Sequence, residues 1–157
     1  MKRIVYLSYF FEPDLSACSF RNSSLANQLA LQAKSSKIII DLYTTLPNRY
    51  SNYKLKALTF EKKDNLNIHR ISLPKFKSGF FGQIISFIKF YKDVKRLNKN
   101  KKADLVFASS SKLFTAFLGY VIAIRSKSIL YLDIRDIFID TLDSVIRFKI
   151  LKLLIFP

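Results

Sequence analysis

Two polar clusters directly follow short apolar runs in the second half of the chain, at residues 109–111 and 133–136. Their chemically capable members are Ser109, Ser110, Ser111, Asp133, Arg135 and Asp136. An arginine can hold a phosphate through two parallel N–H bonds, and a carboxylate can orient a hydroxyl group or accept its proton. Serines before a helix can bind an anion together with the free N–H groups of the first turn. The two clusters therefore indicate a site for a phosphate-bearing substrate.

Candidate roles within these clusters follow from residue type. Asp133 and Asp136 are the candidate catalytic residues, because either carboxylate could orient an acceptor hydroxyl. Arg135 and the three serines are the candidate phosphate-binding residues. The alternative is structural: an internal ion pair would fix the turn, Asp136 would cap a helix, and a serine would be an ordinary N-cap.

Polar residues in the first half of the chain could complete the same site. Arg21 lies at the start of the first expected helix, where it could meet a phosphate, although a lone arginine is commonly a solvated surface residue. Thr44, Thr45, Asn48 and Arg49 follow the second expected strand and could line a pocket for the acceptor. Turn formation explains Asn48 equally well.

The segment 103–141 must position both clusters, and its pattern is strand, helix, strand. Residues 105–108 and 129–132 are apolar runs typical of buried strands. Residues 112–125 are apolar on almost every face, which predicts a buried helix between them. Strands joined by such a crossover run parallel, and open parallel sheets bind ligands beyond the carboxyl ends of their strands. Both clusters are expected at that edge.

The rest of the chain extends this unit into a complete layered domain. Apolar runs predict further strands at Lys2–Tyr9, at Ile38–Tyr43 and, at or near a sheet edge, at Leu66–Ile71. Helical spacing of apolar residues predicts helices at 20–33, 81–97 and 143–156. Loops are expected at 10–19, 73–82 and 49–64, the last with a short helix as the alternative. We therefore expect an α/β fold with a Rossmann-like, doubly wound, mainly parallel sheet.

The composition fits one basic domain. The chain has 157 residues, of which 50% are hydrophobic, and only three glycines and four prolines, so it can bury a core. The net charge of +16 indicates an anionic neighbour such as nucleic acid, an anionic membrane surface or a phosphorylated substrate. No apolar run reaches the roughly 18 residues of a spanning helix. The first nine residues are interpreted as a strand and not as a signal peptide.

Metal-binding side chains are scarce. Cys18 is the only cysteine and His69 the only histidine, so neither a zinc site nor an intramolecular disulfide is expected, and a reducing compartment is the simple interpretation. Cys18 is interpreted as a small residue in a tight loop and not as a catalytic thiol. His69 is expected to be a surface or edge residue, on a strand away from the two clusters. No cofactor is expected to bind this domain alone.

The helix expected over residues 81–97 combines aromatic and cationic side chains. This pattern is typical of a helix lying on an anionic membrane surface. The residues expected to face the membrane are Phe81, Lys89, Lys92, Lys95 and Arg96. An ordinary sheet-packing helix with a basic outer face has the same pattern, and the two interpretations are compatible.

Three blocks carry a resemblance to a known family: MKRIVYLSYFFEPDLSACSFR, LYTTLPNRY and ADLVFASSSKLFTAFLGYVIAIRSKSILYLDIRDIF. They resemble the N-terminal half of bacterial glycosyltransferases of family 4, in the branch that adds N-acetylated amino sugars to lipopolysaccharide O-antigen and capsule chains. The resemblance implies one half of a GT-B fold. Residues 1–157 would be the acceptor-side, N-terminal domain, and the C-terminal sugar-nucleotide domain, which binds the UDP-sugar donor, would be absent.

The resemblance also implies partners and a location. The acceptor would be a sugar linked to a lipid pyrophosphate, and the protein would be cytoplasmic, peripheral at the inner face of the bacterial cytoplasmic membrane. The expected function is retaining glycosyl transfer in surface polysaccharide biosynthesis, incomplete in this chain alone and completed by a separate donor-domain polypeptide. The alternative is a non-catalytic module that binds a membrane surface or a lipid-linked acceptor. Nucleic-acid binding ranks last, because no recognition motif accompanies the lysines.

Overall fold

The computed structural model describes residues 2–48, 56–74, 80–110 and 113–135. Its strands are β1 (Arg3–Leu7), β2 (Ile39–Thr45), β3 (Phe60–Lys63), β4 (Leu66–Ile71), β5 (Leu105–Ser109) and β6 (Ile129–Asp133). Its helices are α1 (Ala17–Ala33), α2 (Phe80–Leu97) and α3 (Leu113–Ser126). The expected helix at residues 143–156 lies outside the described residues.

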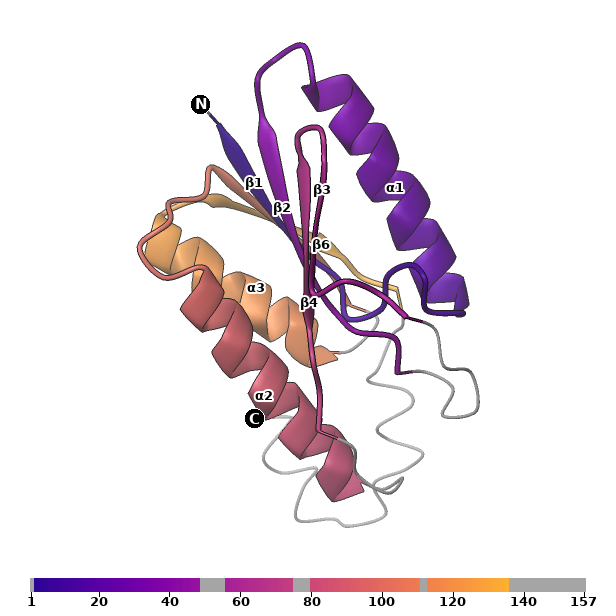
Figure 1. Ribbon diagram of the computed structural model, residues 1–157. Coiled ribbons are helices and arrows are strands. Elements are labelled where there is room, and N and C mark those ends of the chain that lie inside the picture. The colour runs from indigo at the N-terminus through magenta and orange to yellow at the C-terminus, as the bar shows by residue number, and fades with distance from the viewer. Residues whose placement is uncertain (1, 49–55, 75–79, 111–112, 136–157) are drawn as a thin grey trace.

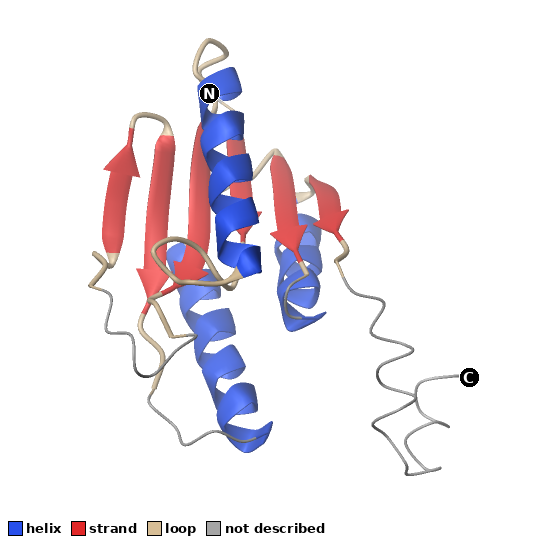
Figure 2. Cartoon of the chain, turned by 90° about the vertical axis from the view of Figure 1, so that its right-hand side faces the viewer, coloured by secondary structure: helices blue, strands red, loops and turns tan. Residues whose placement is uncertain are grey.

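The six strands form one sheet in the order β3, β4, β2, β1, β5, β6. All neighbouring pairs are parallel except β3 and β4, which form an antiparallel pair at one edge. Helix α1 covers one face of the sheet, and α2 and α3 cover the other (Figures 1 and 2). The predicted α/β, Rossmann-like, mainly parallel sheet is confirmed.

Successive side chains of a strand point to opposite faces of the sheet, so the hydrophobic core has one part on each face. On β1, Val5 and Leu7 pack with Phe90 of α2 and Leu118 of α3, whereas Tyr6 faces α1 and packs with Ala26. All six side chains are fully buried. A strand buried on both sides requires a continuous apolar run, as the sequence of β1 has.

Helix α1 begins at Ala17, three residues before the predicted start. The side chain of Ser16 caps it by accepting a hydrogen bond from the Ser19 backbone N–H at 3.1 Å. The buried residues of α1 are small or polar and recur at helical spacing: Ser19, Asn22, Ser23, Ala26, Ala30 and Ala33. Small side chains let the helix lie close to the sheet. The buried polar residues are all in the N-terminal half of α1, which is the half near the carboxyl ends of the strands.

Three expectations about the elements are wrong. Residues 129–132, expected as a buried strand, form β6 at the edge of the sheet, where Ile129 is 70% and Tyr131 is 58% exposed. The segment 49–64, expected as a loop or short helix, contains β3, because pairing with β4 satisfies its backbone groups. Helix α3, expected to be buried on all sides, is not. Its sheet-facing residues Leu118 and Ile122 are buried, but Phe117 is 55% and Ile124 is 57% exposed. Packing on the sheet therefore accounts for only part of the apolar composition of α3.

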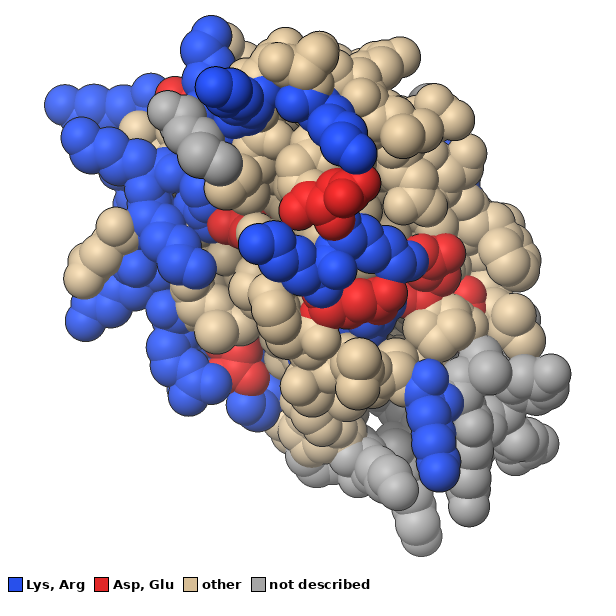
Figure 3. Space-filling view, turned by 45° about the horizontal axis from the view of Figure 1, so that its top comes forward, with Lys and Arg blue, Asp and Glu red and all other residues tan. Residues whose placement is uncertain are grey.

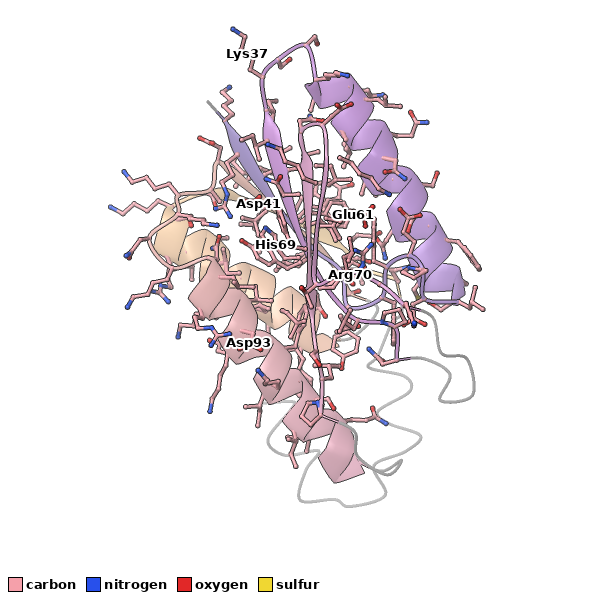
Figure 4. The ribbon with its side chains drawn as sticks, viewed as in Figure 1. Lys37, Asp41, Glu61, His69, Arg70 and Asp93 are labelled. Atoms are coloured by element: carbon pink, nitrogen blue, oxygen red, sulfur yellow. The ribbon has the colours of Figure 1, made fainter. Side chains whose placement is uncertain are left out.

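The prediction for His69 is also wrong in part. Its strand, β4, is next to the edge, and β3 covers the outer side. The ring stacks on Tyr43 with centroids 4.9 Å apart, packs against Phe60 at 5.0 Å, and is only 17% exposed in its side chain. Figure 4 shows His69 beside Asp41 inside the molecule. The unforeseen strand β3 is the reason that this histidine is sheltered.

Candidate functional site

The candidate site lies at the carboxyl ends of β5 and β6, opposite the first turns of α1. Nη2 of Arg21 lies 2.9 Å from Oδ1 of Asp133, and the hydroxyl of Ser109 donates a hydrogen bond of 3.1 Å to Oδ2 of the same carboxylate. Asp133 ends β6 and Ser109 ends β5, and the two residues are register partners in the parallel pair. The sheet and helix α1 thus bring three predicted site residues together.

Arg135 approaches the same cluster from the chain that leaves β6. Its backbone N–H donates to the hydroxyl of Ser110 at 3.1 Å, and the backbone N–H of Ser110 donates to the carbonyl of Asp133 at 3.0 Å. In the side chain of Arg135, Nη1 is buried and has no hydrogen-bond partner among the described residues. A buried guanidinium nitrogen without a partner is energetically costly, and an anion would satisfy it.

Two residues that the sequence analysis missed support the cluster from beneath. The hydroxyl of Tyr6 donates to Oδ1 of Asn22 at 2.9 Å, and Nδ2 of Asn22 lies 3.4 Å from the hydroxyl of Ser109. Nδ2 also donates to the carbonyl of Cys18 at 2.9 Å, which fixes the amide orientation. Asn22 is fully buried. The sequence did contain a signal for Asn22. It is a polar residue three positions after Ser19, on the side of α1 that faces the sheet.

The electrostatics of the cluster favour ligand binding over general-base catalysis. Burial raises the pKa of the Tyr6 hydroxyl well above its ordinary value, and the Asp133 carboxylate raises it further, against the opposing charges of Arg21 and Arg135. Tyr6 therefore stays protonated at neutral pH. Both oxygens of Asp133 accept bonds, so its carboxylate is held in place as a partner of Arg21 and Ser109.

The candidate residues after β2 belong to a second network. Thr45 is buried, and its hydroxyl donates to the carbonyl of Tyr9 at 2.8 Å. The side-chain amide of Asn48 donates to Oγ1 of Thr45 at 2.7 Å, and its backbone N–H donates to Oδ2 of Asp14 at 3.2 Å. These bonds tie the loop after β2 to the loop after β1. These contacts of Asn48 are those of the alternative interpretation, a turn-fixing residue, and the pocket-lining roles of Thr45 and Asn48 stay predictions.

Three predicted site residues, Ser111, Asp136 and Arg49, lie outside the described residues. Their proposed roles stay predictions. In the described part of the chain, no group of three or more His, Cys, Asp or Glu side chains is arranged to hold a metal ion.

The cations expected to face a membrane lie on α2, with different surroundings. Asp93 forms ion pairs with Lys89 and with Arg96, the latter at 3.2 Å. Lys92 and Lys95 instead line an apolar groove between α2 and α3. The side chain of Phe81 is outside the described part. Figure 3 shows Lys and Arg side chains gathered on the left of the molecule, where α2 and α3 end in Figure 1.

Other buried charges have structural partners outside the cluster around Asp133. Arg70 is 3% exposed in its side chain, pairs with Glu61 at 2.9 Å and donates to the carbonyl of Glu12 (Figure 4). Arg3 pairs with Asp41 at 2.5 Å. These pairs join neighbouring strands and loops, so we assign them to the fold and not to the candidate site.

Comparison with known proteins gives matches in structure alone. No protein-family model matches the sequence, and no curated protein matches it. A solved structure of sucrose-phosphate synthase from Thermosynechococcus elongatus is similar with a TM-score of 0.58 at 11% identity, over 84% of this chain and 32% of that chain. A UGT transferase from Siraitia grosvenorii, solved in complex with UDP, is similar with a TM-score of 0.49 at 9% identity, over 84% of this chain and 27% of that chain.

The similarity to the synthase shows the fold. The chain shares the Rossmann-like, mainly parallel architecture of one part of that enzyme, and it spans about a third of the synthase's length.

Proposed function

We propose that this chain is the acceptor-side domain of a sugar-nucleotide-dependent glycosyltransferase. The observation that carries the proposal is the buried, unpartnered Nη1 of Arg135 beside Arg21 and Asp133 at the carboxyl edge of the sheet. Ligands of open parallel sheets bind at that edge, and guanidinium groups suit phosphate oxygens. Fold similarity to a sucrose-phosphate synthase supports the same assignment, as an argument from fold.

The finer parts of the proposal follow the sequence resemblance. The substrate class is a sugar acceptor carried on a lipid pyrophosphate, the donor is a UDP-sugar bound by a separate donor domain, and transfer retains the anomeric configuration in surface polysaccharide biosynthesis. In this assignment Arg135 and Arg21 bind the acceptor pyrophosphate. Asp133 holds Arg21 in position through their ion pair, and Ser109 holds the Asp133 carboxylate through a hydrogen bond.

A second candidate function is acceptor binding without turnover by this chain. The pairing of both Asp133 oxygens favours it, because a carboxylate that already accepts two hydrogen bonds is a poor general base. The two functions share one binding site and differ only in whether transfer follows.

Binding of inorganic pyrophosphate to the full chain, measured by isothermal titration calorimetry, tests the shared site. Replacing Arg135 by Gln should weaken binding on the order of 10-fold or more, because a hydrogen bond to a charged group contributes about 1.5–3 kcal/mol. Arg125→Gln, which removes an exposed arginine from α3, is the matched control and should leave binding unchanged. Equal weakening in both variants would refute a specific site.

Transfer itself is tested by supplying the chain with a UDP-linked N-acetylated amino sugar, a prenyl-pyrophosphate-linked acceptor and a polypeptide that contains a UDP-sugar-binding donor domain. Formation of a product with the donor's anomeric configuration, read by nuclear magnetic resonance, supports the glycosyltransferase. Pyrophosphate binding without any transfer in the presence of that polypeptide supports acceptor binding alone.

A further inference from the structure

The outer side of helices α2 and α3 carries an apolar groove that faces away from the sheet. Its volume is about 900 Å³. The groove, which we call the α2–α3 groove, is lined by Ile84, Phe87, Ile88, Tyr91, Lys92, Lys95, Phe114, Ala116 and Phe117. Phe87 and Phe114 meet across it with ring centroids 4.7 Å apart. The packing of these two helices therefore leaves an aromatic channel open at the surface.

Large apolar side chains on both helices continue this surface beyond the groove. Those with more than two fifths of their area exposed are Ile85, Ile88, Phe114, Phe117, Tyr120 and Ile124. On α3, Phe117, Tyr120 and Ile124 lie away from the buried side that carries Leu118 and Ile122, so packing on the sheet does not account for them. Contiguous apolar surface of this kind marks an interaction site.

The charges around this surface are almost all positive. Helices α2 and α3 together carry five basic side chains and one acidic side chain, Asp93. Asp93 is neutralised by ion pairs with Lys89 and Arg96. Lys92 and Lys95 line the groove itself, and Nζ of Lys95 lies 5.5 Å above the ring of Tyr91. A molecule that binds this face must therefore accommodate apolar side chains and present negative charge around them.

We propose that this two-helix face docks on an anionic lipid bilayer. Aromatic and aliphatic side chains from both helices enter the boundary between headgroups and acyl chains, and Lys92 and Lys95 contact the lipid phosphates. A second copy of the chain fits poorly, because two lysine-lined faces repel each other. None of the described helices is long and apolar enough to cross a membrane, so the contact is in the plane of the surface.

This inference does not rest on the proposed sugar transfer. The groove residues are distinct from the cluster around Asp133, and lipid binding can be measured without sugar or nucleotide. Loss of pyrophosphate binding in Arg135→Gln and loss of lipid binding in the variants below are therefore separate results.

Sedimentation of the full chain with vesicles gives the first test. Binding should be strong to vesicles of phosphatidylcholine with about one third phosphatidylglycerol, weak to phosphatidylcholine alone, and reduced by salt. The double variant Lys92→Gln with Lys95→Gln should reduce the partition coefficient about 25-fold, since each basic side chain near an anionic surface is worth about a factor of five. Equal binding to both vesicle types would overturn the proposal.

Absence of tryptophan from the chain allows a sharper test. Phe117→Trp places a single fluorophore on the two-helix face, and Phe20→Trp places one on α1, across the sheet, where Phe20 is similarly exposed at 61%. Anionic vesicles should shift the emission of Phe117→Trp to shorter wavelength, and brominated acyl chains should quench it. Phe20→Trp should show neither effect.

Two outcomes would overturn the docking face. One is an equal blue shift for both tryptophan variants, which would indicate nonspecific adsorption. The other is concentration-dependent dimerisation without lipid, seen by analytical ultracentrifugation and abolished by Phe117→Ser, which would assign the face to a second copy. Far-ultraviolet circular dichroism confirms that Phe117→Ser and its control Phe20→Ser remain folded.

Discussion

Nη2 of Arg21 lies 2.9 Å from Oδ1 of Asp133, across a sequence separation of 112 residues. This ion pair joins the start of α1 to the end of β6, and through Ser109 it also reaches β5. Asp133 is 11% exposed in its side chain and Arg21 is 49% exposed. The two partners therefore contribute differently to stability, although they share one contact.

The first prediction follows from this asymmetry. Asp133→Asn should lower the free energy of unfolding by about 2 kcal/mol, because an amide NH2 would replace one of the two oxygens that accept from Arg21 and from the buried Ser109 hydroxyl. Arg21→Gln should lower it by less than about 1 kcal/mol, as for other half-exposed ion pairs. Urea unfolding followed by circular dichroism measures both changes. Lys34→Gln, which breaks an exposed pair with Asp64, is the control and should have almost no effect.

The second prediction concerns pH and the Asp41 carboxylate. Burial opposes its ionisation, but the contacts from His69, Asn67 and Arg3 outweigh burial and hold the pKa of Asp41 well below its ordinary value. A lowered folded-state pKa stabilises the fold above the unfolded-state pKa near 4, and this stabilisation is lost as the pH falls below it. Asp41→Asn should therefore cost about 2 kcal/mol at pH 7 and progressively less below about pH 4.

Equilibrium unfolding of the wild type and Asp41→Asn between pH 7 and pH 3 measures this effect. Asp64→Asn, which changes a carboxylate 70% exposed in its side chain, is the matched control and should remain parallel to the wild type. A cost for Asp41→Asn that is the same at pH 7 and pH 3 would contradict the electrostatic explanation.

The third prediction concerns the contact between α3 and β5. A Cβ atom built on Gly119 would lie 2.7 Å from Cβ of Ala108, closer than two side-chain carbons can pack. Gly119→Ala should therefore destabilise the protein by about 1–3 kcal/mol, even though alanine favours helix by about 1 kcal/mol. Thermal unfolding of Gly119→Ala, Ala108→Gly and the double variant gives the coupling. Additive effects would show that the two positions are not in contact.

The fourth prediction concerns the start of α1. Ser16→Ala removes the side-chain acceptor for the Ser19 N–H and should cost about 1 kcal/mol of stability. Ser16→Asp should retain the cap. Ser24→Ala, in the same helix but exposed, is the control, and a similar loss in that variant would show that the cap is not responsible.

Local sequence patterns were sufficient for most of the fold. The apolar runs that became β1, β2 and β5 predicted buried parallel strands because such strands must be apolar on both faces. The run that became β6 predicted a parallel strand correctly but its burial wrongly, because β6 lies at the edge of the sheet. The order of strands and helices then left few arrangements of the sheet. Strand β3 was missed, because a short, charged edge strand at Phe60–Lys63 has no apolar run and is specified by its partner β4.

The candidate site was predicted in its members but not in its contacts. Strand ends pointed to Ser109, Asp133 and Arg135, since parallel strands finish at one edge. Nothing local to Arg21 indicates that it meets Asp133, because that contact depends on how α1 crosses the sheet. The exposed side of α3 was missed for a related reason: apolar content predicts burial, whether the burying partner is the sheet or another molecule.

The position of β1 in the sheet has a consequence for biosynthesis. It is the first strand of the chain and lies in the middle of the sheet, between β2 and β5. On the ribosome β1 can pair with β2 early, but its other edge waits until residues 105–109 have emerged. At roughly 5–20 residues per second, that delay lasts on the order of several seconds. During it, the edge of β1 that will pair with β5 has unpaired backbone N–H and C=O groups from Ile4 to Leu7, so nascent chains should need chaperone protection until β5 is complete.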